Sequence, residues 1–167
     1  MDLLFLFEWL DTSMLANISK SSAGIFSIVQ AIHILSMVML MGMILLGDLR
    51  MLNVLLRDVP SDVVVENTGK WIKIALVCII LSGIYEASAI AMKLYFNTFY
   101  WAKMAGLAMG LVYMYVFRNP LYRAQALAVA GGAGAEAVNP AVIKLVAVTS
   151  LIIWFTVAAS GRWIGFS

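Results

Sequence analysis

The chain has 167 residues, of which 63% are hydrophobic and 12% charged, and its mean hydropathy is +0.97. A soluble domain carries about twice that charged fraction, so the composition predicts an integral membrane protein of one domain. The formal net charge of +2 is small and dispersed, which excludes nucleic acid as an expected partner, and the single cysteine, Cys78, excludes an intrachain disulfide.

The first predicted element is an amphipathic segment over residues 2–18. Its apolar residues recur at three- and four-residue spacing, whereas Glu8 and Asp11 fall elsewhere on the helical wheel. The proposed apolar stripe consists of Leu3, Phe7, Leu10, Met14 and Ile18. Because charged residues interrupt it, the segment is expected to form a short helix that lies in the membrane interface rather than one that spans it.

Four membrane-spanning helices are predicted to follow. They cover residues 22–47, 71–94, 99–117 and 140–160. Ser21 or Ser22 is expected to cap the first, and Pro140 suits the first position of the fourth. A polar stretch with a break at Thr68-Gly69 should precede the second. Arg118-Asn119-Pro120 should end the third, before an alanine- and glycine-rich loop over 121–139. The predicted fold is an all-α bundle, a single membrane domain over 1–167.

Basic residues set the expected orientation. Seven Lys and Arg residues flank the loops after the first and third spans, against three on the other side. By the positive-inside rule, this predicts that both termini are periplasmic in a multi-pass protein of the bacterial inner membrane.

Each predicted span carries one ionisable residue toward its outer end. His33, the only histidine, lies midway through the first span, which no Asp, Glu, Lys or Arg interrupts. Glu86 and Lys103 lie in the second and third spans, and Arg162 lies at the outer end of the fourth. An ionisable residue inside a membrane is a candidate functional residue because its burial in hydrocarbon is costly. We therefore take these four as the candidate cofactor-binding residues.

Each of these residues also has a purely structural explanation. His33 could hydrogen-bond a neighbouring helix, Lys103 could extend its ammonium to the surface, and Arg162 could anchor its helix at the interface. Asp48 and Arg50, at the inner end of the first span, are expected to form a surface or helix-end ion pair.

Two further patterns allow a structural and a functional interpretation. Met37 and Met41 follow His33 by four and eight residues on nearly the same helix face, so the three could bind copper(I). In a methionine-rich chain the same spacing also suits core packing. Ala102, Gly106 and Gly110 form a stripe of small residues, which predicts close packing against another helix.

The chain resembles an uncharacterised family of small bacterial four-helix membrane proteins from about residue 25 onward. The resemblance rests on the runs AIHILSMVMLMGMILLGDLRML, TGKWIKIALVCIILSGI, FNTFYWAKMAG and SLIIWFTVAASGRWIGF. More distantly, the pattern is similar to HemJ-type protoporphyrinogen oxidases and copper-resistance D membrane proteins. Their early-helix histidine matches His33, and the HemJ-type lysine matches Lys103. In the HemJ type these positions are associated with b-type haem, so the resemblance implies haem b here.

Three functional hypotheses follow. In the first, His33 is the axial ligand of haem b, Lys103 and Arg162 pair with its propionates, and the protein serves electron transfer or porphyrin or quinone redox chemistry. In the second, His33, Glu86 and Lys103 relay protons or metal ions such as copper across the membrane. In the third, the chain is a structural subunit of a larger membrane complex. The expected partners are the lipid bilayer, a quinone or redox protein, and other subunits, including copies of itself.

Overall fold

The computed structural model describes residues 3–131 and 138–164, and helices are the only regular elements in those ranges. In chain order they are α1 (Leu4–Thr12), α2 (Met14–Ser21), α3 (Ala23–Met51), α4 (Ser61–Ala89), α5 (Ala91–Tyr95), α6 (Thr98–Tyr113), the π-helix η1 (Met114–Arg118), α7 (Asn119–Val129) and α8 (Pro140–Trp163). In these ranges, α3, α4 and α8 are the three helices long and apolar enough to cross a membrane.

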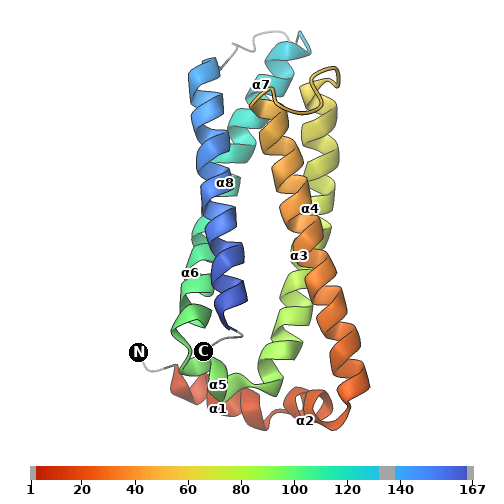
Figure 1. Cartoon of the computed structure of the whole chain (residues 1–167), viewed down its shortest axis with the longest axis vertical. Coiled ribbons are helices and arrows are strands. Elements are labelled where there is room, and N and C mark those ends of the chain that lie inside the picture. Colours follow the sequence, from red (N-terminus) through yellow and green to blue (C-terminus); the bar gives the residue numbers. More distant parts are fainter. Residues whose placement is uncertain (1–2, 132–137, 165–167) are drawn as a thin grey trace.

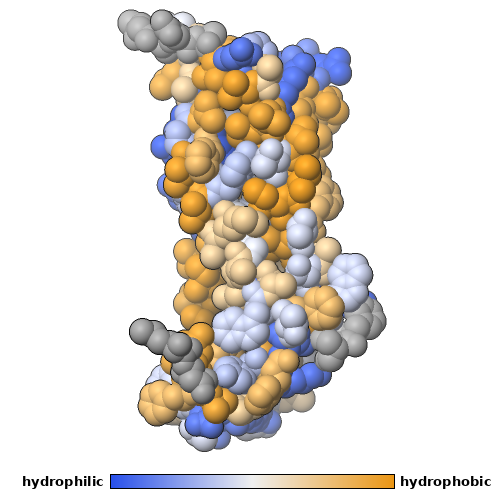
Figure 2. Space-filling view, turned by 90° about the vertical axis from the view of Figure 1, so that its left-hand side faces the viewer, coloured by the Kyte–Doolittle hydropathy of each residue, from blue (hydrophilic) through white to orange (hydrophobic). Residues whose placement is uncertain are grey.

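The long helices form a bundle of two packed pairs. α3 packs along α4, and α6 packs along α8 (Figure 1). α7 continues beyond η1 to the far end, whereas α1, α2 and α5 lie across the end where α8 finishes (Figure 1). Figure 2 shows apolar side chains over much of one face, with hydrophilic ones gathered mainly toward the two ends. This distribution is consistent with the predicted membrane protein.

α3 extends beyond the end of the first predicted span, to Met51, and α4 begins ten residues before the second predicted span, at Ser61. Ser22 caps α3 as expected, because its Oγ accepts a hydrogen bond from the Ile25 amide at 3.4 Å. α4 already begins at Ser61 and passes through Thr68-Gly69 without interruption, so the break predicted there is wrong. The Thr68 hydroxyl donates to the Val64 carbonyl at 2.7 Å, which satisfies this polar side chain inside its own helix.

The N-terminal segment is two helices rather than one amphipathic stripe. Ser13 separates them, and its Oγ accepts from the Ala16 amide at 3.2 Å, which starts α2. The new helix turns a different face inward: Ala16 and Ser19 are buried, whereas Met14 and Ile18 are exposed. Ser13 therefore divides the predicted single segment into two helices, and Met14 and Ile18 lie on an exposed face, unlike the buried Phe7 of α1.

The third predicted span does not end at Arg118-Asn119-Pro120. The chain remains helical from α6 through η1 into α7, and Pro120 sits in the first turn of α7, where its missing N–H is tolerated. The beginning of the predicted 121–139 loop is therefore helix, and its residues 132–137 lie outside the described part of the chain. Pro140 opens α8 as predicted, with Asn139 Oδ1 accepting from the Ala141 amide at 2.9 Å.

An apolar core fills the middle of the bundle. It consists of Leu40, Ile44, Ile72, Ala75, Leu76, Ile79, Met114 and Trp154. The stripe of small residues on α6 lies against α8, as predicted: a Cβ at Gly106 would lie 3.0 Å from Val157 Cγ2, and one at Gly110 would lie 3.3 Å from Ile153 Cγ2. The missing side chains let the two helices approach closely.

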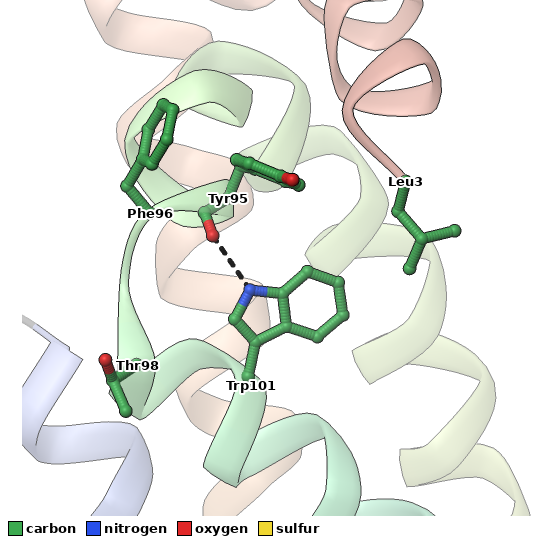
Figure 3. Close-up of a pocket in the computed structure, with 5 residues that line it drawn as sticks. All are labelled: Leu3, Tyr95, Phe96, Thr98 and Trp101. Atoms are coloured by element: carbon green, nitrogen blue, oxygen red, sulfur yellow. Dashed lines mark hydrogen bonds between the residues drawn. The ribbon is translucent and has the colours of Figure 1, made fainter. Parts of the chain in front are cut away.

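Aromatic side chains join α1 to α5 and α6. The Phe7 ring meets Tyr95 edge-on, with ring centroids 5.4 Å apart, and Trp101 Nε1 donates to the Tyr95 carbonyl at 2.8 Å. Figure 3 shows Tyr95 and Trp101 beside Leu3, Phe96 and Thr98, around an open cavity of about 510 Å³. Among the described residues of the lining, the Tyr95 phenol is the one ionisable group.

Candidate functional site

His33 is held against α4 by a short chain of hydrogen bonds. Its ring is buried, and Nδ1 lies 2.8 Å from Ser82 Oγ. The Ser82 hydroxyl in turn donates to the Cys78 carbonyl at 2.5 Å. A Cβ at Gly83 would lie only 3.2 Å from His33 Cε1, so the glycine lets the imidazole lie close to the α4 backbone.

The short contact between Ser82 and the Cys78 carbonyl favours one tautomer of His33. A serine hydroxyl has one proton, and Ser82 uses it on the Cys78 carbonyl. With that proton on the Cys78 carbonyl, Ser82 Oγ accepts from His33 Nδ1, so this arrangement favours the tautomer with its proton on Nδ1. In the neutral ring, the lone pair is then on Nε2. This is the usual arrangement of a metal-ligating histidine, in which one nitrogen binds the metal and the other donates to the protein.

Two of the other predicted residues face the same region. The charge of Lys103, on α6, acts on both His33 and Glu86, so the structure brings together ionisable groups from three helices. A Cβ at Gly161 would lie 3.6 Å from Lys103 Cδ and 3.8 Å from its Nζ. The lysine stem therefore lies along α8. Glu86 Oε1 is buried and has no hydrogen-bond partner in the described part of the chain.

The remaining predicted residues lie at the edges of this region. Arg162 is exposed in the last turn of α8. Met37 and Met41 are partly buried and pack against the apolar core. Their packing agrees with the structural interpretation, and the copper prediction remains untested.

A second polar cluster lies at the other end of α3, where we expected a surface ion pair. Asp48 is fully buried and pairs with Arg118 rather than with Arg50: Arg118 Nε donates to Asp48 Oδ1 at 2.7 Å. Arg50 instead donates from Nε to the Val59 carbonyl at 2.9 Å. The prediction of an Asp48–Arg50 pair is wrong because Asp48 faces the inside of the bundle, where the guanidinium group of Arg118, on η1, lies beside it.

Tyr122 and Gly47 complete this second cluster. The Tyr122 hydroxyl donates to Asp48 Oδ1 at 2.9 Å, and its ring lies 4.6 Å from Arg118 Cζ. Burial, and then the nearby Asp48 carboxylate, raise the pKa of Tyr122. A Cβ at Gly47 would lie 2.8 Å from Arg118 Nη2. A larger residue at this position would therefore displace the guanidinium group, which donates to Asp48 and to the Ile44 carbonyl.

Sequence reasoning missed this cluster because its key residue was assigned to a helix end. Arg118 precedes Asn119-Pro120, which is a common stop signal. The π-helix instead inserts one residue into the turn and redirects Arg118 inward, where it is 3% exposed. An aspartate at the end of an apolar run was the available signal, since it needs a partner when buried.

The two clusters are separated along the bundle. His33 and Asp48 lie on the same helix, about 22 Å apart at 1.5 Å per residue, and the apolar core fills the space between them. Each cluster is therefore a local arrangement at one end of the bundle.

A family model described as a family of unknown function (DUF6644) matches residues 6–167, which is nearly the whole chain. Neither the curated proteins nor the solved structures contain a match to this chain.

Proposed function

We propose that this chain, which belongs to the family of unknown function DUF6644, binds b-type haem through His33 and serves electron transfer or porphyrin or quinone redox chemistry. The observation that carries the proposal is the hydrogen bond between His33 Nδ1 and Ser82 Oγ, together with the 2.5 Å contact of Ser82 Oγ with the Cys78 carbonyl, which favours a proton on Nδ1. It leaves the Nε2 lone pair for a metal.

The proposal includes a topology. Besides α3, α4 and α8, the helical run from Thr98 to Arg118 is about 30 Å long at 1.5 Å per residue, which is enough for a fourth span. Four spans leave α1 and the end of α8 on one side, in agreement with Figure 1, and the positive-inside rule makes that side periplasmic. α1 and α2 would then lie in the interface of a bacterial inner membrane.

The residues near His33 would supply both an iron ligand and positive charges for the carboxylates of a haem. His33 would be the axial ligand, and Lys103 and the more exposed Arg162 would hold the propionates by charge-assisted hydrogen bonds. Bound haem would supply one-electron chemistry. Glu86 balances the Lys103 charge. The distant similarity to HemJ-type oxidases, in which His33 and Lys103 match haem-associated positions, supports the same assignment.

An optical spectrum tests this proposal. The full chain, purified in detergent from cells supplied with a haem precursor, should show a Soret band and, after dithionite reduction, b-type peaks. His33→Ala should lose most of the haem. The matched control is Ser36→Ala, because Ser36 is buried one turn away and its hydroxyl donates to the Ile32 carbonyl of its own helix. A colourless wild-type protein, or a His33→Ala variant with full haem content, would refute the proposal.

Ion or proton movement is the second candidate function. It is favoured by the buried, unpartnered Glu86 Oε1 beside the Lys103 charge, an arrangement typical of carboxylates that exchange protons. The apolar core between His33 and Asp48 would have to admit water for such a relay. Proton flux into liposomes that falls in Glu86→Gln, from a protein that binds no haem, would favour the relay over the redox function. Absence of flux in oriented liposomes would exclude it.

A further inference from the structure

A small cavity lies at the end of the bundle opposite α1. It has a volume of about 300 Å³ and forms where α3 ends, α4 and α8 begin and α7 passes by. Its polar lining residues include Arg50, Ser61, Gln125 and Lys144. The volume is at the lower limit for pockets that hold small molecules, so it suits a compact group.

Among the described residues, the cavity is lined by the cations Arg50 and Lys144 and by no carboxylate. Arg50 is held in place by bonds from its Nε to the Val59 carbonyl at 2.9 Å and from its Nη1 to Asn53 Oδ1 at 3.2 Å. Lys144 is exposed in the first turns of α8. Asp62, the nearest acidic residue in sequence to Ser61, is exposed and is not part of the lining. The lining residues therefore favour a negatively charged ligand.

Ser61 supplies an independent indication of a ligand. Its side chain is 4% exposed, and its Oγ has no hydrogen-bond partner in the described part of the chain. A buried hydroxyl without a partner is costly, so an acceptor inside the cavity would stabilise it. Ser61 also opens α4, whose N-cap, Pro60, provides no side-chain hydrogen bond. The first-turn amides of this 29-residue helix and its dipole add to the preference for an anion.

We propose that this cavity binds a phosphate group, with the Ser61 hydroxyl donating to a phosphate oxygen and the Arg50 and Lys144 side chains neutralising its charge. Arginine and lysine are the usual side-chain partners of phosphate. Because the cavity lies at the end of the spanning helices, the phosphate could belong to a phospholipid headgroup or to a soluble ion. Both ligands present the same phosphate group, and only the phospholipid carries acyl chains.

A thermal-shift titration of the full-length protein in neutral detergent separates the two sources. One arm adds inorganic phosphate, and the other adds phosphatidylglycerol, with phosphatidylcholine as the zwitterionic reference. Binding to the folded state raises Tm in proportion to occupancy. The wild type should gain Tm in at least one arm: a gain in both identifies a site open to free phosphate, and a gain with phosphatidylglycerol alone identifies a headgroup site.

Three variants test the assignment. Lys144→Gln should raise the half-saturating concentration about five-fold, as expected for losing one cation near a phosphate at the membrane surface. Ser61→Ala should weaken binding while leaving the unliganded Tm unchanged or higher, since it removes an unpartnered polar atom. Lys70→Gln, an exposed lysine on α4 outside the lining, is the matched control. No gain in either arm, or the same loss in Lys70→Gln as in Lys144→Gln, would overturn the proposal.

Discussion

Asp48→Asn is expected to destabilise the protein strongly while leaving the shape of the side chain unchanged. The substitution removes the negative charge beside Arg118, which is 3% exposed and 2.7 Å from Asp48 Oδ1. Breaking a buried ion pair by removing one partner costs about 3–5 kcal/mol, because the other charge stays buried. The asparagine carbonyl can still accept from Arg118 and Tyr122, so we expect a value near the lower limit, about 3 kcal/mol.

The assay is reversible unfolding of the detergent-solubilised protein, with the free energy of unfolding compared between variants. Asp62→Asn provides the matched control, since Asp62 is exposed in the first turn of α4. Its replacement should change the free energy of unfolding by less than about 0.5 kcal/mol.

A double variant tests whether the lost stability comes from the Arg118 charge that is left without its partner. Asp48→Asn combined with Arg118→Met removes both charges, and such replacements are often close to neutral. The double variant should therefore recover most of the stability lost in Asp48→Asn alone. The buried pair would not be what stabilises this end of the bundle if Asp48→Asn lowers the free energy of unfolding no more than Asp62→Asn does. The same conclusion would follow if the double variant is less stable than Asp48→Asn.

Two further predictions concern the same cluster. Gly47→Ala should lower the free energy of unfolding by about 1–3 kcal/mol, because the added methyl group would lie 2.8 Å from Arg118 Nη2. Gly42→Ala is the control, since a Cβ there would have nothing within 4 Å, and it should be neutral or stabilising in the same unfolding assay. Equal effects of the two substitutions would contradict this prediction. Tyr122 has a raised pKa because of burial and then Asp48, so its contribution to stability should be complete below about pH 10, the pKa of an unfolded tyrosine, and should be lost as the pH rises above it. The Tm of the wild type should fall more steeply above pH 10 than that of Tyr122→Phe, and parallel curves would show that this phenol does not contribute.

The sequence predicted the helical membrane character of the chain for a direct physical reason. A run of about twenty apolar residues can be recognised without knowing its neighbours, and so can local start signals such as the Ser22 cap and Pro140 at the first position of α8. The small-residue stripe on α6 was legible for the same reason, because its spacing on one helix face already implies close packing. The element boundaries were less well predicted. Thr68-Gly69 is a break by composition, yet packing of α4 against α3 keeps it helical.

The candidate site was partly predictable. His33, Glu86 and Lys103 stand out because each is ionisable in an apolar run, and the structure brings them within electrostatic reach. Sequence could not reveal the role of Ser82, because a serine in a membrane helix usually bonds to its own backbone. The position of this serine opposite His33 depends on the register of α3 against α4. That register is a property of packing between elements.

The chain by itself thus determined which segments are helical and apolar, since propensity, capping and hydropathy are local properties. Only the tertiary structure decided which polar groups meet. Asp48 and Arg118 are separated by seventy positions, and a single π-turn determines whether they face each other. The same holds for the cavity between Ser61 and Lys144, which exists only because two helix beginnings and one helix end converge.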